Sequence, residues 1–217
     1  MAGETPETEA LRLLSCGDLP AEGRMPWSSN ATFLVDVIEQ GEVRAQAVYK
    51  PTRGERPLWD FPPGLHRREV AAYRLSASLG WGIVPPTVVR DGPYGEGSVQ
   101  LFVPSDFEQH YFTLEDDPTH RHRLQQICVF DLVANNTDRK SGHVLVDDVG
   151  HLWAIDNGLS FHAEFKLRTV IWEFAGEPVP DDLLADTARL VTDGLPDPLA
   201  RLLDPFERDA VLARARA

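Results

Sequence analysis

A polar loop and the two short apolar runs that follow it contain the residue types that phosphoryl transfer requires. Asp138 stands in the loop, and Asp156 begins an Asp-x-Gly sequence after the second apolar run. Phosphoryl transfer needs one carboxylate beside the attacking hydroxyl and a second carboxylate on a metal ion. A hairpin with one carboxylate at each end would hold both at a fixed separation. We therefore predict that Asp138 is a catalytic residue and that Asp156 is a metal ligand.

Two charged residues earlier in the chain have the types that position the phosphates of ATP. Lys50 ends a β-rich run, and Glu69 follows in a predicted helix. A strand-borne lysine that is held by a helix carboxylate suits the α- and β-phosphates. Lysine is rare in this chain, which has only Lys50, Lys140 and Lys166. We therefore predict that Lys50 contacts ATP and that Glu69 fixes the position of its ammonium group.

Each of these four residues also has an ordinary structural interpretation. A lysine at a strand end is usually solvated, and a glutamate beside arginines is typical of a helix surface. Asp138 and Asp156 could be turn residues, because Asn and Asp favour turns. Their occurrence in the order Lys, Glu, apolar strand, Asp and Asp favours the phosphoryl-transfer interpretation.

The segment that precedes the first β-rich run is rich in small polar residues. Ser28, Ser29 and Asn30 lie there. Small hydroxylated residues let backbone N–H groups approach a phosphate, although the same residues also suit a simple turn. We predict that these three residues line a phosphate-binding loop.

The distribution of β-rich and helical runs predicts an α+β protein with two lobes. A β-rich lobe is expected over residues 1–104 and a mainly helical lobe over residues 105–217. Alternation of apolar and polar residues predicts strands, and apolar residues at helical spacing predict helices. The predicted strands are 31–38, 43–50 and 98–103, and the predicted helices are 66–79, 121–134, 166–173, 181–192 and 197–217.

The composition is typical of a globular protein in a reducing compartment. Of 217 residues, 42% are hydrophobic and 25% are charged, and only Cys16 and Cys128 are cysteines. The acidic start lacks the features of a signal peptide, and no apolar run approaches the ~20 residues of a membrane span. The net charge of −13 disfavours nucleic acid and anionic membranes as partners. We expect a cytoplasmic protein without integral membrane association.

Taken in order, the motifs resemble the phosphatidylinositol 3/4-kinase-like superfamily of atypical kinases. The similarity is greatest to type II phosphatidylinositol 4-kinases and extends more distantly to HipA-type toxin kinases. The chain also resembles a set of small bacterial kinase-like proteins. It covers about residues 25–175. The residues that carry it are Val48–Pro51, Arg68–Tyr73, Ile83–Thr87, Gly97–Val103, Asn136–Arg139 and Ala154–Leu159.

The resemblance implies a bilobal kinase-like fold with ATP and a divalent metal, Mg²⁺ or Mn²⁺, bound between the lobes. Gln100 and the backbone near Phe102 and Val103 would contact the nucleotide. The reaction would transfer the γ-phosphoryl group to a hydroxyl of a protein or a small molecule. A lipid head group is less expected, because the chain is acidic and has no basic membrane patch.

His143 departs from the pattern of that family. The family usually has asparagine five residues after the catalytic Asp, as the second metal ligand, and here that residue is His143. Imidazole suits Mn²⁺ and later transition metals better than Mg²⁺. The departure keeps open a nucleotide-binding pseudokinase with a regulatory role, and the same residues would also serve an AMP transferase. The other six histidines lack metal-ligand spacing and are predicted on the surface or in loops.

Overall fold

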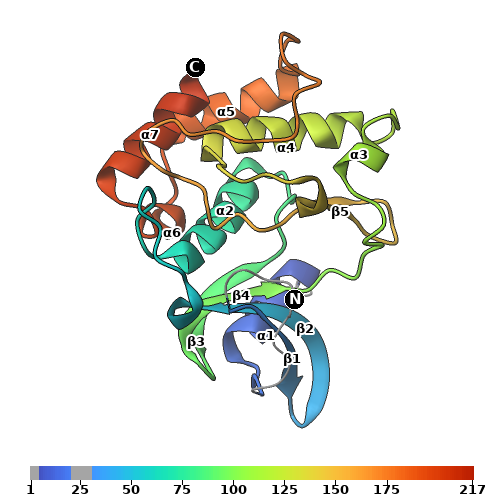
Figure 1. The fold of residues 1–217 in the computed structure, drawn as a ribbon, viewed down its shortest axis with the longest axis vertical. Helices are drawn as coiled ribbons and strands as arrows, with labels where there is room; N and C mark the ends of the chain where they lie inside the picture. The colour runs from blue at the N-terminus through green and yellow to red at the C-terminus, as the bar shows by residue number, and fades with distance from the viewer. Residues whose placement is uncertain (1–4, 21–30) are drawn as a thin grey trace. The chain divides into compact units, whose positions relative to one another are not determined.

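The computed structural model describes residues 5–20 and 31–217, which form two compact units (Figure 1). The sheet unit comprises Met1–Val70 and Pro85–Val103, and the helical unit comprises Ala71–Val84 and Pro104–Ala217. Ser28, Ser29 and Asn30 lie outside the described residues. The lobe boundary expected after residue 104 stays a prediction.

The sheet unit contains a four-stranded antiparallel sheet in the order β1-β2-β4-β3. Gln40 and Gly41 form the turn between the first two strands, with φ values of 55° and 82°. Two-residue hairpin turns favour positive φ because their twist then matches that of the strands. The predicted strands 31–38 and 43–50 are therefore observed as a paired hairpin. The strands are β1 (Phe33–Glu39), β2 (Glu42–Pro51), β3 (Thr87–Gly92) and β4 (Gly95–Leu101), with a short 3₁₀ turn, η1 (Thr52–Gly54), after β2.

Helix α1 (Pro6–Cys16) covers the apolar face of this sheet. Leu13 and Leu14 of the helix share one core with Val37, Tyr49 and Val99 of the strands. Burial of these side chains supplies the driving force for the packing, at roughly 1.5–3 kcal/mol for each large apolar side chain.

The N-terminal end of helix α2 (Leu65–Leu79) is capped by a carboxylate from the loop after β2. Glu55 accepts hydrogen bonds from the backbone N–H groups of Gly64 at 3.0 Å and His66 at 2.8 Å. The ring of His66 is buried, with Nδ1 3.0 Å from Glu55 and Nε2 3.0 Å from Glu96. The surface position predicted for His66 is therefore wrong. The reason is that the carboxylates of Glu55 and Glu96 each contact one ring nitrogen of His66 inside the sheet unit.

The helical unit is built around α4 (Arg121–Ala134), whose Leu124, Ile127 and Phe130 are fully buried. Within residues 5–20 and 31–217, no helix is both long and apolar enough to cross a membrane. The remaining elements are α3 (Tyr111–Leu114), η2 (Ser141–His143), β5 (Val144–Val146), β6 (Leu152–Ala154), α5 (Asp181–Asp193), α6 (Asp197–Ala200) and α7 (Pro205–Arg216). The two apolar runs after the polar loop pair as the antiparallel hairpin β5–β6.

Two helices predicted in this unit differ from the structure. Residues 166–173 are not helical. Instead, the N–H of Arg168 donates to the carbonyl of Asn136 at 2.9 Å, and the Arg168 carbonyl accepts from Arg139 at 3.0 Å. A segment whose backbone groups bind a neighbouring loop cannot also make helical bonds. The helix predicted over 197–217 is broken, because Asp204 caps a new helix that starts at Pro205.

The contacts of Glu55 predict an acid-dependent contribution to stability. Burial raises the pKa of this carboxyl, but hydrogen bonds from His66 and from backbone N–H groups outweigh burial and lower it from 4.5 to about 2. A carboxyl with a lowered folded-state pKa stabilises the protein above its unfolded pKa, and this stabilisation is lost as the pH falls towards about 2. We expect Glu55→Gln to lower the unfolding free energy at pH 7 by roughly 1–3 kcal/mol.

Thermal or denaturant unfolding of wild type and Glu55→Gln, measured from pH 7 to pH 3, checks this expectation. The difference should hold down to about pH 4.5 and shrink below it. Glu42→Gln, at an exposed position in the same unit, serves as the control and should leave stability unchanged. A difference for Glu55→Gln that grows as the pH falls would contradict the role of Glu55.

Candidate active site

In the sheet unit, the structure brings Lys50 and Glu69 together. The ammonium of Lys50 donates a hydrogen bond to the Glu69 carboxylate, from β2 to α2. Glu69 is buried, whereas the Lys50 side chain is partly exposed. A buried carboxylate requires a cationic or hydrogen-bonding partner, so this contact fixes where the ammonium lies. The roles of the two residues towards ATP stay predictions.

The three residues predicted beside the nucleotide lie at the end of β4. The side chain of Gln100 is buried and donates to Thr87 Oγ1 at 2.9 Å. Phe102 and Val103 are half-buried, and the N–H of Phe102 donates to the Gln46 carbonyl at 2.9 Å. The Gln100 amide and the Phe102 N–H are therefore engaged inside the sheet unit. Their contact with a nucleotide stays a prediction.

In the helical unit, the loop that carries Asp138 starts where α4 ends. Asn135 caps the helix in the left-handed conformation, with φ of 55°. The side chain of the buried Asn136 then accepts the N–H of Asp138 at 2.9 Å. The next residue back, Thr137, donates its N–H to the Leu159 carbonyl at 2.8 Å. The backbone on both sides of Asp138 is thus fixed, while its side chain remains 37% exposed.

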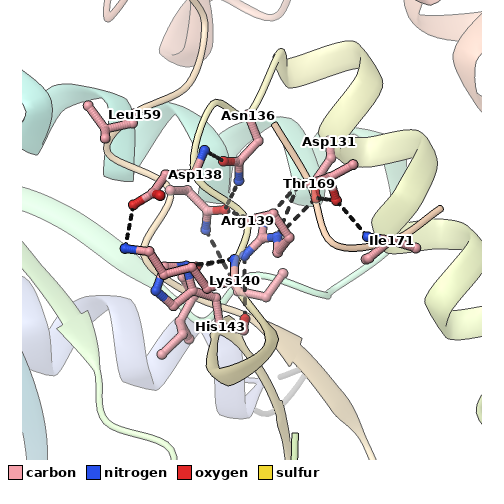
Figure 2. Close-up of polar contacts among 12 residues, drawn as sticks. Asp131, Asn136, Asp138, Arg139, Lys140, His143, Leu159, Thr169 and Ile171 are labelled. Carbon is pink, nitrogen blue, oxygen red and sulfur yellow. Dashed lines mark hydrogen bonds and ion pairs between the residues drawn. The ribbon is translucent and has the colours of Figure 1, made fainter. Parts of the chain in front are cut away.

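Arg139 ties this loop to the residues around Asp156, as Figure 2 shows in part. Its guanidinium is completely buried and ion-paired with Asp131 of α4 at 2.9 Å. It also donates to the Asn157 side chain at 2.7 Å and to the carbonyls of Ile155 at 2.8 Å and His143 at 3.4 Å. The Nε–H group donates to Asp131 Oδ2 at 3.0 Å, so all five donors of the guanidinium are engaged. Arg139 therefore sets the position of the loop that carries Asp138 relative to the Asp-x-Gly turn.

Reasoning from the sequence missed Asp131 and Asn157 as members of this network. The available signal for Asp131 was a lone carboxylate in an otherwise apolar stretch of predicted helix, because buried charges are rare unless they are paired. Asn157 gave no comparable signal, since its type is common in turns.

The structure also brings together the two residues predicted as metal ligands. His143 Nε2 lies 3.4 Å from Asp156 Oδ2. The N–H of Ile155 donates to the His143 carbonyl at 2.9 Å, which fixes the two backbones side by side. Asp156 has a left-handed φ of 56°, a conformation that aspartate adopts more readily than most residues. Burial lowers the pKa of His143, although the carboxylate of Asp156 acts in the opposite direction. The neutral imidazole is the form that binds metals.

This pair fits a metal ion that arrives with a nucleotide rather than one held by the protein alone. Among the residues that the structure describes, no group of three or more His, Cys, Asp or Glu side chains is arranged to hold a metal. Mg²⁺ in phosphoryl-transfer sites commonly takes one or two protein ligands, and phosphates and waters supply the rest. The imidazole imposes one condition. Its Nδ1 accepts a long hydrogen bond from the Lys140 N–H at 3.4 Å, so a metal at Nε2 requires the other tautomer and the loss of this weak bond.

The buried ion pair predicts a large loss of stability when one partner is removed. Arg139→Leu leaves the carboxylate of Asp131 buried without its cation, which costs about 3–5 kcal/mol. Adding Asp131→Leu removes that carboxylate and should recover part of the loss. Chemical unfolding at pH 7 measures both variants. The control, Arg201→Leu, removes an exposed ion pair with Asp197 and should change stability by less than about 1 kcal/mol. If Arg139→Leu also lowered stability by less than about 1 kcal/mol, the stabilising role of the Arg139–Asp131 contact would be contradicted.

Comparison of the sequence with known proteins shows similarity to a kinase family. Residues 88–200 match the family model described as phosphatidylinositol 3- and 4-kinase. Protein Rv2133c of Mycobacterium tuberculosis is 41% identical in an alignment that covers 88% of this chain and 80% of that protein.

Solved structures of low sequence identity share the fold. A crystal structure of the Golgi casein kinase with Mn and ADP bound has a TM-score of 0.66 at 16% identity, covering 96% of this chain and 73% of that one. Fam20 from hydra, solved with sugar, has a TM-score of 0.60 at 15% identity, covering 100% and 88%. The Helicobacter pylori proinflammatory kinase CtkA has a TM-score of 0.53 at 11% identity, covering 94% and 92%. The predicted α+β, kinase-like fold with a sheet-rich and a helical portion is confirmed.

Proposed function

The chain belongs to the phosphatidylinositol 3- and 4-kinase family, and from this premise we propose that it is an ATP-dependent kinase. It would transfer the γ-phosphoryl group to a hydroxyl of a protein or a small molecule. The observation that carries the proposal is the network of Arg139, which joins the loop of Asp138 to the turn of Asp156. In phosphoryl transfer one carboxylate contacts the acceptor hydroxyl and another binds the metal, so the two carboxylates must be held at a fixed separation.

Each residue has a chemical role in this proposal. Lys50, held by Glu69, would bind the phosphates of ATP. Asp138 would take the proton of the acceptor hydroxyl while the acceptor oxygen bonds to the γ-phosphorus and the bridge to ADP breaks. Asp156 and His143 would hold the divalent metal, which neutralises charge on the phosphates when it is bound.

The acceptor we propose is not a phosphoinositide, despite the name of the family. The formal net charge is −13, and anionic membrane surfaces attract basic rather than acidic proteins. A hydroxyl on a protein or a small molecule presents no such electrostatic barrier.

Incubation with ATP, Mg²⁺ or Mn²⁺ and a set of hydroxyl-bearing proteins and metabolites tests the proposal. Mass spectrometry of every component should find a gain of about 80 Da on an acceptor, together with formation of ADP. A gain of about 329 Da with release of pyrophosphate would instead show AMP transfer. Nucleotide binding without transfer to any acceptor would favour a regulatory pseudokinase.

The two aspartates should differ when each is replaced. Asp138→Asn removes the proton acceptor, so turnover should fall by about 10²–10⁴-fold while metal-dependent nucleotide binding is retained. Asp156→Asn should also weaken that binding, because it removes a charged metal ligand. Calorimetric titration with ADP and Mn²⁺ separates the two effects. Asp148→Asn, at an exposed position between β5 and β6, is the matched control. Near-normal turnover in Asp138→Asn would remove Asp138 from catalysis.

We expect His143 to determine which divalent metal the protein prefers. A nitrogen ligand favours Mn²⁺ over Mg²⁺, which prefers an all-oxygen shell. We expect Mn²⁺ to support nucleotide binding better than Mg²⁺, and we expect His143→Asn to narrow that preference. Titrations of ADP affinity against each metal, made side by side for the two proteins, measure the ratio. Identical ratios in the two proteins would show that His143 does not set the metal.

A further inference from the structure

We propose that a groove beside α4 binds a segment of a protein acceptor in which basic residues flank apolar side chains; this docking role rests on the proposed kinase function. The groove has a volume of about 270 Å³ and lies between α4 and the chain that leads into α5. All of its lining residues belong to the helical unit. Figure 1 shows this stretch of chain running along α4 before it turns into α5.

The lining of the groove is mainly apolar. Its larger apolar side chains are Val129 and Leu132 of α4 and, from the opposite wall, Leu167, Trp172 and Phe174. Trp172 is 60% exposed and Leu132 is 40% exposed. Scattered exposed apolar residues are ordinary, but apolar side chains gathered in one hollow are typical of an interaction site. Tryptophan is also among the residues that contribute most to binding at protein interfaces.

The size of the groove indicates which part of a ligand it can hold. A cavity of about 150 Å³ holds one benzene molecule, so the groove has room for about two large apolar side chains. Pockets that enclose drug-sized molecules are commonly larger, at about 300–1,000 Å³. Side chains presented by a peptide segment therefore fit this groove better than a whole metabolite does.

Acidic residues border the groove and indicate the charge of its ligand. Residues 173–182 contain no lysine, arginine or histidine, and their carboxylates are Glu173, Glu177, Asp181 and Asp182. Arg121 pairs with Glu177 at 2.5 Å and His122 with Asp182 at 2.9 Å, which leaves an excess of negative charge. Charge complementarity favours basic residues beside the apolar side chains of the ligand. The same charge disfavours a membrane of anionic lipids as the occupant.

One wall of the groove is joined to the loop that carries Asp138. Leu167 and Thr169 line the groove. Arg168 lies between them, and its backbone N–H and carbonyl both bond to that loop, on either side of Asp138. A segment seated in the groove would therefore lie against a wall that is fixed to the proposed catalytic carboxylate. Tethering an acceptor there would raise the effective concentration of its hydroxyl at Asp138.

Selection from a displayed library of random short peptides tests the groove. Wild type serves as the bait, and Trp172→Ala is used to remove peptides that bind elsewhere. We expect the enriched peptides to combine leucine or aromatic residues with lysine and arginine. The affinity of these peptides, labelled with fluorescein and measured by fluorescence polarisation, should fall at least roughly tenfold in Trp172→Ala. Asp181→Asn should weaken them roughly twofold, because it removes one border charge.

Two further variants separate loss of the groove from loss of the fold. Leu132→Gln alters the opposite wall and should weaken the same peptides. Phe206→Ala removes an aromatic side chain of α7 that is 77% exposed, and it should bind them as wild type does. Equal thermal midpoints for wild type and Trp172→Ala would show that the substitution leaves the fold intact.

Phosphate transfer then tests whether the bound segment belongs to an acceptor. Each enriched peptide is synthesised with one serine at a series of distances from its apolar residues and incubated with ATP and Mn²⁺. Replacing those apolar residues by alanine should raise KM and change kcat little, because the groove contacts are the same before and during the reaction. In Trp172→Ala the original and the alanine peptides should have equal KM values, since the contact that distinguishes them is lost.

The outcomes distinguish the docking role from the kinase function. If the enriched peptides bind Trp172→Ala and Leu132→Gln as tightly as wild type, or if none is enriched, the docking role is overturned and the kinase proposal stands. Binding to phosphatidylserine vesicles that Trp172→Ala abolishes would assign the groove to membranes and overturn it as well. If peptides bind the groove but none receives phosphate, they are not acceptors and the docking role is overturned. Failure of wild type to bind ADP with Mn²⁺ would show separately that the kinase function is wrong.

Discussion

The buried contact between Arg139 and Asp131 is the interaction on which the helical unit's site depends. A charged group removed from water is costly unless hydrogen bonds replace its hydration. Arg139 meets this requirement only when α4, its own loop and the residues around Asp156 all supply acceptors at once. The arrangement is therefore closely defined, because displacing any one of the three segments would leave a buried donor or a buried carboxylate without a partner.

Exposed charged groups extend from this buried network. The carboxylates of Asp138 and Asp156 and the ammonium of Lys140 reach solvent, while the residues that hold their backbones are inside the protein. This division would suit the proposed kinase, because the groups assigned to the reaction would have to meet substrates, whereas their spacing would have to stay constant. The left-handed backbone of Asp156 belongs to the constrained part, since its flanking residues both contact Arg139.

The sheet unit holds its own charged pair by a similar principle. Glu69 is buried, and its carboxylate accepts a hydrogen bond from the ammonium of Lys50. The helix that carries Glu69 is fixed at its first turn by Glu55, which caps the backbone and contacts the buried ring of His66. Lys50 of β2 thus contacts the carboxylate of Glu69. The helix that carries Glu69 is held at His66, three residues earlier, by Glu55.

The sequence by itself determined every strand except β3, most of the helices, and the pairs Lys50 with Glu69 and Asp156 with His143. These follow from local periodicity and from the order of charged residues along the chain. Only the tertiary structure decided that residues 166–173 run unwound beside the loop of Asp138, that His66 is buried, and that Arg139 joins Asp131 to Asn157. Each of these outcomes depends on hydrogen-bond partners far away in the sequence, and local propensity carries no information about such partners. The nearness of Lys140 to Asp138 was also undecided, because side chains two positions apart share a side in an extended backbone but not in a helix, and local propensity does not define the backbone of this loop.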